Sequence, residues 1–258
     1  MTGINNTKGF TLIELIGVMA IIAILAATIA PSVIRDMDRS LGEAEQTNLS
    51  TLATELQTYI SINKVIPAST NWTTSIASIG SLPVAKIAQN DRLHNRAYYV
   101  DPRFFTTSNT NFSQYSQTNG LTNRPVSPRI IIASNLKGNL PNNLNSSSDF
   151  NDVWNQSIGA PIIESQDVKI QRVNLQGYFH RVILTNSNTT DSPGYRLETG
   201  VTQSVSSSNT EIYVLKDTKL TLIDAPFTNN IISQALLVTD ANSFAFTDDS
   251  GSWQWQNL

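Results

Sequence analysis

An uninterrupted apolar segment near the start of the chain constrains its fold more than any other feature. Residues 10–30 read FTLIELIGVMAIIAILAATIA and hold one charged side chain, Glu14. As a helix, a segment of this length spans about 30 Å, the thickness of the hydrocarbon core of a bilayer. A cleaved secretory signal has a shorter apolar region, with a small-residue cleavage site beyond it. The segment therefore predicts a membrane-spanning helix, and Lys8 on its short polar side favours an N-in orientation.

Glu14 is the residue of this segment that most needs an explanation. A carboxylate at membrane depth costs about 3 kcal/mol and by default marks a function. One interpretation is that Glu14 lies near the membrane edge and extends its carboxylate toward water. The other is that it pairs with a cation one helical turn away or on another chain. The residues around Glu14 favour the second interpretation.

Residues 8–15, KGFTLIEL, resemble the class III signal of type IV prepilins and type II secretion pseudopilins. The resemblance implies that a membrane peptidase cuts between Gly9 and Phe10 and methylates the new amine of Phe10. It also implies that Glu14 meets this amine on a neighbouring subunit of a filament. Removal of either member of such a pair leaves an uncompensated charge, which typically costs about 3–5 kcal/mol.

Small side chains and a proline give the apolar segment further features. Small residues recur every three or four positions and form a ridge for close helix packing, unless alanine is simply frequent in such helices; they are Gly17, Ala20, Ala23, Ala27 and Ala30. Pro31 follows, and a proline inside a helix kinks or melts the preceding turn. The resemblance implies that Pro31 belongs to the assembly element, with local unwinding of the stem in the fibre.

The helical pattern continues beyond Pro31. Apolar residues recur mostly at intervals of three or four: Ile34, Met37, Leu41, Ala44, Leu49, Leu52, Leu56, Tyr59 and Ile60. The opposite, solvent-facing side is expected to carry Asp36, Asp38, Arg39, Glu43, Glu45 and Glu55. We therefore predict one stem helix of about 52 residues, or about 80 Å, that ends before Pro67. Its heptad is too irregular for a coiled coil, so its amphipathic half is expected to pack on the protein's own sheet.

From Pro67 onward, short alternating segments between Asn, Ser, Gly and Pro clusters indicate strands and loops. Strands are expected at 97–100, 129–133, 168–175, 178–184, 195–198, 211–215, 220–223, 235–239 and 244–246, with an edge strand around Trp253 and Trp255. Short helices are expected at 72–79 and 150–154, and polar loops at 108–122 and 136–148. A hairpin is expected at Gly177, and a turn between strands at 216–219.

These elements predict an α+β fold, in which a long N-terminal helix packs on a mostly antiparallel sheet, as in pilins. The expected divisions are a leader at 1–9, a stem at 10–66 with its apolar part at 10–30, and a β-rich head at 67–258. The chain has no cysteine, so the head cannot use a disulfide, although many pilins do.

The head shows little that indicates chemistry. Its two histidines, His94 and His180, lack acids at a metal-ligand spacing, and no nucleotide-binding, hydrolase or zinc-protease motif is present, so an enzyme is not expected. Arginines and aromatics interleave between Arg92 and Phe105, which would suit nucleic acid, but packing is the better interpretation in a chain of net charge −3.

The C-terminal segment holds one candidate for a metal site. Asp240, Asp248 and Asp249 lie around Ser250 and Gly251, and carboxylates in a glycine-containing loop can bind Ca²⁺. A plain acidic turn is the alternative that we favour, so no cofactor is expected.

The sequence therefore predicts a structural subunit, a pilin or minor pilin, of a type IV pilus-like filament. Its expected partners are other pilin subunits, the prepilin peptidase and methylase, and the bacterial inner membrane, with nucleic acid not expected. The precursor would lie in that membrane and the assembled protein in an extracellular or periplasmic filament. A pseudopilin of a type II secretion or competence system is the alternative. A binding module that the helix merely tethers to the membrane is a further one.

Overall fold

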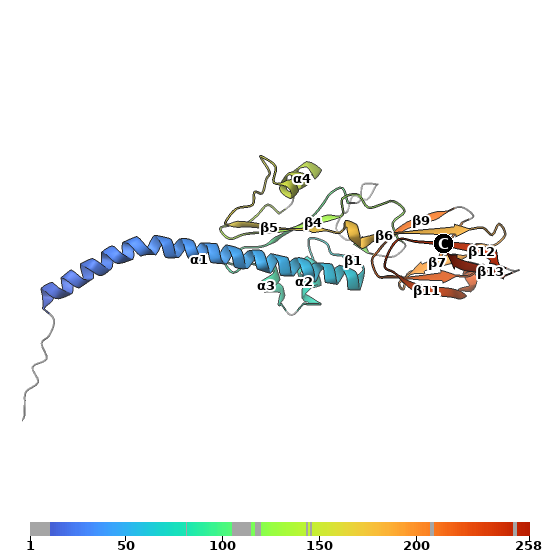
Figure 1. Cartoon of the computed structure of the whole chain (residues 1–258), viewed down its shortest axis with the longest axis horizontal. Coiled ribbons are helices and arrows are strands. Elements are labelled where there is room, and N and C mark those ends of the chain that lie inside the picture. Colours follow the sequence, from blue (N-terminus) through green and yellow to red (C-terminus); the bar gives the residue numbers. More distant parts are fainter. Residues whose placement is uncertain are drawn as a thin grey trace, which may run out of the picture.

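The computed structural model describes residues 11–80, 82–104, 115–116, 120–142, 144, 146–206, 209–249 and 252–258. The expected leader, 1–9, and Phe10 therefore lie outside the described residues. The molecule is elongated, with a long helix at one end, a sheet packed along the second half of this helix, and a separate β-sandwich beyond the helix end (Figure 1). This is the predicted α+β layout, and it is consistent with a pilin-like fold.

The first element, α1 (Leu12–Asn63), has the predicted length of 52 residues. Thr11 is its N-cap, and its C-cap, Lys64, adopts a left-handed conformation with φ of 54°. The backbone N–H of Lys64 donates to the carbonyl of Ile60 at 2.9 Å, which closes the last turn. The helix thus ends four residues before Pro67, as predicted.

The two halves of α1 lie in different surroundings. Every residue from 11 to 37 is exposed. Beyond this part, residues buried against the head recur every three or four positions; they are Gly42, Glu45, Leu49, Leu52, Ala53, Leu56 and Ile60. The predicted packing face was therefore placed too early, because Ile34 and Met37 are exposed and the first buried residue of α1 is Gly42.

The inner lobe of the head is a three-stranded antiparallel sheet packed on α1. Its order is β2 (Ala97–Val100), β4 (Arg129–Asn135) and β5 (Val168–Asn174). The small helices α2 (Trp72–Ala77) and α3 (Val84–Ala88) lie on the other side of α1, whereas α4 (Ser147–Asn155) covers the far face of the sheet (Figure 1). A two-stranded sheet, β1 (Val65–Ile66) with β3 (Tyr115–Ser116), completes this lobe.

Two apolar cores stabilise the inner lobe, one on each face of its sheet. The core between sheet and helix includes Leu52 and Leu56 of α1 with Ile130 and Ile132 of β4. The core on the far face joins Ile131 of β4 to α4. Alternate residues of β4 therefore point to opposite cores, and this is why β4 reads as a continuous apolar run in the sequence.

The outer lobe is a sandwich of two four-stranded sheets. One sheet has the order β11-β10-β7-β8 and the other β13-β12-β6-β9. Their bounds are β6 (Phe179–Asn186), β7 (Gly194–Leu197), β8 (Gln203–Ser204), β9 (Thr210–Leu215), β10 (Thr218–Ile223), β11 (Ile232–Val238), β12 (Asn242–Asp249) and β13 (Ser252–Asn257), with the 3-10 turns η1 (Gln176–Tyr178) and η2 (Phe227–Asn229). Inward side chains of both sheets form one core, and β12 lies parallel to β6.

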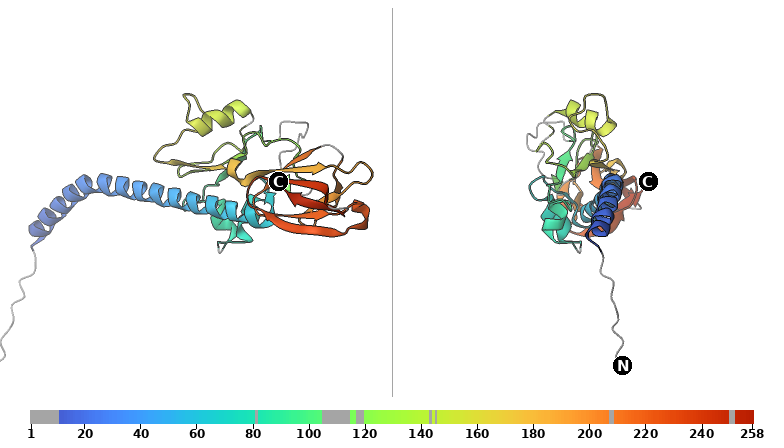
Figure 2. Two further views of the ribbon diagram at one scale, coloured as in Figure 1. Left: turned by 45° about the vertical axis from the view of Figure 1, so that its right-hand side comes forward. Right: turned by 90° about the vertical axis from the view of Figure 1, so that its left-hand side faces the viewer.

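The sandwich is the largest departure from the prediction of one sheet laid on the helix. The expected hairpin at Gly177 is wrong, because β5 pairs with β4 whereas β6 pairs with β9 and β12. Gly177 lies in η1, through which the chain passes from the inner lobe to the outer one (Figure 2). The turn at 216–219 exists, but it joins β9 and β10 of opposite sheets. Most other strands, the two predicted helices and the edge strand β13 are confirmed.

Candidate functional site

The exposed first part of α1 is the candidate functional site. Within the described part of the chain, α1 is the one helix that is long and apolar enough to cross a membrane. None of its side chains between Thr11 and Met37 is covered by the head, although most of them are apolar. An apolar helix that the rest of the protein does not cover requires lipid or another protein around it. The sequence prediction of a membrane anchor agrees with this geometry.

Glu14 closes the N-terminus of this helix. Its Oε2 atom accepts hydrogen bonds from the backbone N–H and the hydroxyl of Thr11, both at 2.8 Å, and its own N–H donates to Thr11 Oγ1 at 3.4 Å. This reciprocal arrangement is a capping box. The sequence reasoning missed it, although Thr-x-x-Glu at a helix start is its usual signal. Gly9 and Phe10, the predicted processing residues, lie outside the described residues, so the predicted amine partner of Glu14 stays a prediction.

The remaining polar groups of the apolar part are bonded within the helix. Thr28 donates its hydroxyl to the carbonyl of Leu25 at 2.9 Å, and Ser32 donates to Ile29 at 2.7 Å. Pro31 lies inside α1, which stays helical through it. α1 bends in its N-terminal part, which contains Pro31 (Figures 1 and 2), and a proline is the usual cause of such a bend. The turn before Pro31 is thus helical in the isolated chain rather than melted.

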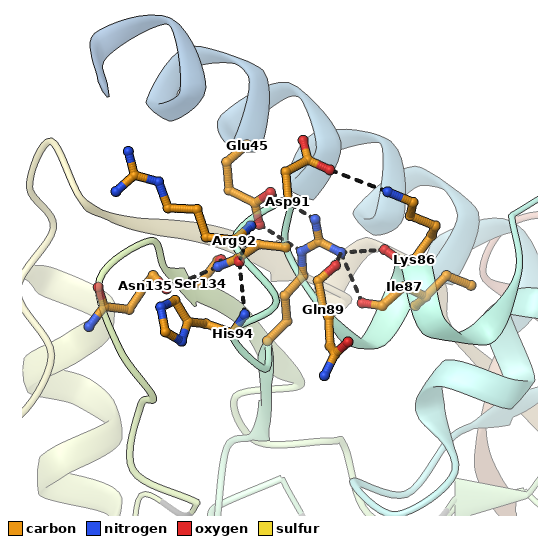
Figure 3. Close-up of polar contacts among 11 residues, drawn as sticks. Glu45, Lys86, Ile87, Gln89, Asp91, Arg92, His94, Ser134 and Asn135 are labelled. Carbon is orange, nitrogen blue, oxygen red and sulfur yellow. Dashed lines mark hydrogen bonds and ion pairs between the residues drawn. The ribbon is translucent and has the colours of Figure 1, made fainter. Parts of the chain in front are cut away.

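A buried ion pair fixes the second half of α1 to the head. Glu45 extends from α1 into the polar cluster of Figure 3, and two hydrogen bonds join its side chain to that of Arg96 at 2.6 and 2.7 Å. Arg96 Nη1 also donates to the carbonyls of Lys86, Ile87 and Gln89, at the C-terminal end of α3. The prediction that Glu45 faces solvent is therefore wrong. The charge of Arg96 makes a buried acid tolerable on this face.

A second polar contact lies nearer the membrane part of α1. Arg92 forms an ion pair with Asp38, and both side chains are partly exposed. Asn90 holds the loop that carries Arg92, because its Oδ1 accepts hydrogen bonds from the backbone N–H groups of Arg92 and His94 at 3.0 and 3.1 Å. His94 is thus part of a loop, with its backbone N–H bonded to Asn90.

The interleaved arginines and aromatics do not form a surface patch. Tyr98, Tyr99 and Phe104 are buried. Asp101, which is fully buried, accepts hydrogen bonds from Arg129 and Arg103, and the guanidinium of Arg129 stacks over Phe150 and Trp154 of α4. These arginines hold the inner lobe together, in agreement with the packing interpretation. Phe105 lies outside the described residues.

The calcium candidates are separated in the fold. Asp240 precedes β12, whereas Asp248 and Asp249 end it. Asp248 lies eight positions after Asp240, which is about 26 Å along an extended chain. Among the described residues, no group of three His, Cys, Asp or Glu side chains suits a metal ion. Ser250 and Gly251, the expected loop residues, lie outside the described residues, so these positions do not form one site in the part that is described.

Comparison with known proteins bears on the N-terminal segment alone. Residues 4–30 match the family model described as the prokaryotic N-terminal methylation motif. The match includes Gly9, Phe10 and Glu14, which were predicted to serve processing and assembly, whereas Pro31, the other predicted assembly residue, lies just beyond it. No curated protein and no solved structure matches the chain. The exposed apolar helix of the structure and the matched motif therefore coincide along the chain.

Proposed function

We propose that this protein is a structural subunit of a type IV pilus-like filament. The proposal starts from the N-terminal methylation motif, which marks a type IV pilin-like prepilin. Cleavage between Gly9 and Phe10 and methylation of Phe10 would convert the membrane precursor into the assembling form. The observation that carries the proposal is the projection of an uncovered apolar helix, with the motif at its start, from a folded head.

The exposed apolar surface of α1 suits two environments in succession, the membrane and the filament. In the precursor, lipid covers the apolar part and the inner membrane anchors the protein. In the filament, helices of other subunits replace the lipid. One stretch of this surface presents only apolar side chains, which include Ile22, Ala26 and Val33. Small residues at Ala23, Ala27 and Ala30 permit close approach of a second helix.

Glu14 supports the proposal through its position. Its carboxylate lies at the start of the helix and is bonded to Thr11 of its own chain. In the filament, the methylated amine of Phe10 from a neighbouring subunit would approach this carboxylate. Such an ion pair forms only when two subunits are correctly aligned, so it would select the axial position of each incoming subunit.

Mass spectrometry of the mature N-terminus tests the proposal. Protein purified from its native membrane or filament is expected to begin with methylated Phe10. A chain that retains residues 1–9 in its native fibre, or that never enters a fibre, would contradict the proposal. An intact N-terminus on a solitary membrane protein would favour a tethered binding module instead.

A pseudopilin of a type II secretion or competence system is the second candidate. The absence of cysteine favours it, because many pilins clamp a C-terminal loop with a disulfide. The two functions differ in where the assembled protein is found. Surface filaments that carry this protein, seen by immunogold electron microscopy, would indicate a pilus, and confinement to the periplasm would indicate a pseudopilus.

A further inference from the structure

A pocket of about 310 Å³ lies where the inner and outer lobes meet. Its lining comes from four parts of the chain that are distant in sequence, namely residues 124–125, η1 with the start of β6, β9 and Ala241. Leu121 and Tyr213 exchange backbone hydrogen bonds at 2.9 and 2.8 Å, which places the segment before Arg124 beside β9. Arg181 of β6 lies directly opposite Tyr213 in the antiparallel pairing.

The charged groups of this pocket are predominantly basic. Its lining includes Arg124 and Arg181 but no acidic residue. Arg181 Nη2 bonds to Glu211 Oε2 at 2.6 Å, and the hydroxyl of Tyr213 donates to Glu211 Oε1 at 2.5 Å, so both oxygens of this neighbouring carboxylate are engaged. Asp240, the acid next to Ala241, accepts the backbone N–H of Ala241.

Arg124 is the second arginine that lines this pocket. It is exposed, and no hydrogen bond or ion pair joins it to another residue in the described ranges. Its charge nevertheless acts on Tyr213: the hydrogen bond to Glu211 and burial raise the pKa of Tyr213, and the charges of Arg181 and Arg124 act in the opposite direction. Arg124, Arg181 and Tyr213 thus line the same pocket, with Arg181 and Tyr213 side by side on paired strands.

The geometry points to an anion-binding site at this junction, which takes a small carboxylate- or phosphate-bearing molecule of about monosaccharide size. Guanidinium groups bind such oxyanions through paired, charge-assisted hydrogen bonds. Phe179 and Tyr213 supply aromatic walls for the apolar face of the ligand, and Gln176 supplies an amide for its hydroxyls. The site would give the head a binding function beyond its role as a filament subunit, and it does not depend on filament assembly.

Calorimetric titration of the full chain in detergent tests this site. Sodium glucuronate and inorganic phosphate are the anionic probes, and glucose is the neutral probe of similar size. At least one anion is expected to bind, and glucose is not. Binding of glucuronate alone would identify a carboxylate ligand, and binding of phosphate alone a phosphate ligand. If neither anion binds at millimolar concentration, or if glucose binds as well as they do, the proposal is wrong.

Two variants show whether the pocket is responsible. Arg124→Ala is expected to weaken anion binding about tenfold or more, the effect of one charge-assisted hydrogen bond. Arg39→Ala is the matched control, because Arg39 is an exposed arginine of α1 whose ion pair is with Glu43, and it should leave the affinity unchanged. Because Arg124 is exposed, the variant is expected to fold, and equal affinities in wild type and Arg124→Ala would overturn the proposal.

Discussion

Glu45 and Arg96 face each other across the junction of stem and head, with side chains that are 2% and 3% exposed. Two parallel hydrogen bonds of 2.6 and 2.7 Å join them. Arg96 also satisfies three carbonyls of the α3 segment. This ion pair therefore couples the orientation of the stem to the fold of the α3 region.

Replacement of Glu45 by alanine is expected to destabilise the head strongly. The guanidinium of Arg96 would stay buried without a counter-charge, which typically costs about 3–5 kcal/mol. Thermal unfolding of the full chain in detergent measures the effect. Glu43→Ala is the matched control, because Glu43 lies two residues away in an exposed pair with Arg39, and such pairs contribute about 0.5 kcal/mol. Similar losses for the two variants would show that the buried pair is not special.

Glu14→Ala is expected to enter the membrane but to assemble poorly. The loss of the carboxylate removes both the capping box and the proposed partner of the Phe10 amine. Thr11→Ala separates these roles, because it removes the hydroxyl of the cap and retains the acid. Immunoblots of membrane and sheared-filament fractions give the readout. Equal defects in both variants would assign Glu14 to capping alone, and normal assembly of Glu14→Ala would contradict its role in subunit alignment.

Pro31→Ala is expected to straighten α1. Alanine restores the backbone N–H that proline lacks, and it removes the clash of the proline ring with the preceding turn. Since the chain has no cysteine, spin labels on cysteines introduced at Val18 and Ala44, both exposed, would report one distance across Pro31 by pulsed electron paramagnetic resonance. This distance should lengthen in Pro31→Ala. Gly17→Ala is the control and should leave it unchanged, since a side chain there meets nothing.

Glu55→Gln is expected to stabilise the head at neutral pH. Burial raises the pKa of Glu55, and its Oε2 has no hydrogen-bond partner among the described residues. Because its pKa is raised in the folded state, ionised Glu55 lowers the free energy of unfolding at pH 7. This loss of stability disappears as the pH falls toward the usual pKa of glutamate, since the carboxyl group of the folded protein is then protonated. The melting temperature of Glu55→Gln should exceed that of the wild type at pH 7, and the difference should shrink at pH 4. A constant difference across this range would exclude ionisation as the cause.

The sequence predicted the stem more accurately than the head for a physical reason. The length of α1 follows from local patterns, namely an apolar segment of membrane length and a helical period that ends before Pro67. Local patterns do not reveal the partner of Glu45, because Arg96 lies 51 residues away along the chain. A single acid on an amphipathic helix usually faces water. For Glu14 the prediction was partial: its unusual position was evident in the sequence, but its hydrogen bonds with Thr11 were missed.

The division of the head into two lobes was also beyond sequence reasoning. Strand positions follow from alternation, and most of them were predicted. Alternation does not reveal which strands pair, so β5 and β6 looked like a hairpin around Gly177 although they enter different sheets. The anion pocket arises at this crossing, from residues of four separate segments. The sequence alone therefore could not predict this pocket.

The passage of the chain from β5 through η1 into β6 has a mechanical consequence. β4 and β5 lie along the long axis of the molecule (Figure 1), so tension on the outer lobe reaches β5 along its own direction. The seven residue pairs between β5 and β4 are then loaded in shear and must yield together. A strand pulled at right angles would instead peel away one pair at a time. The pairing of β5 with β4 thus gives the inner lobe a geometry that resists a pull from the outer lobe.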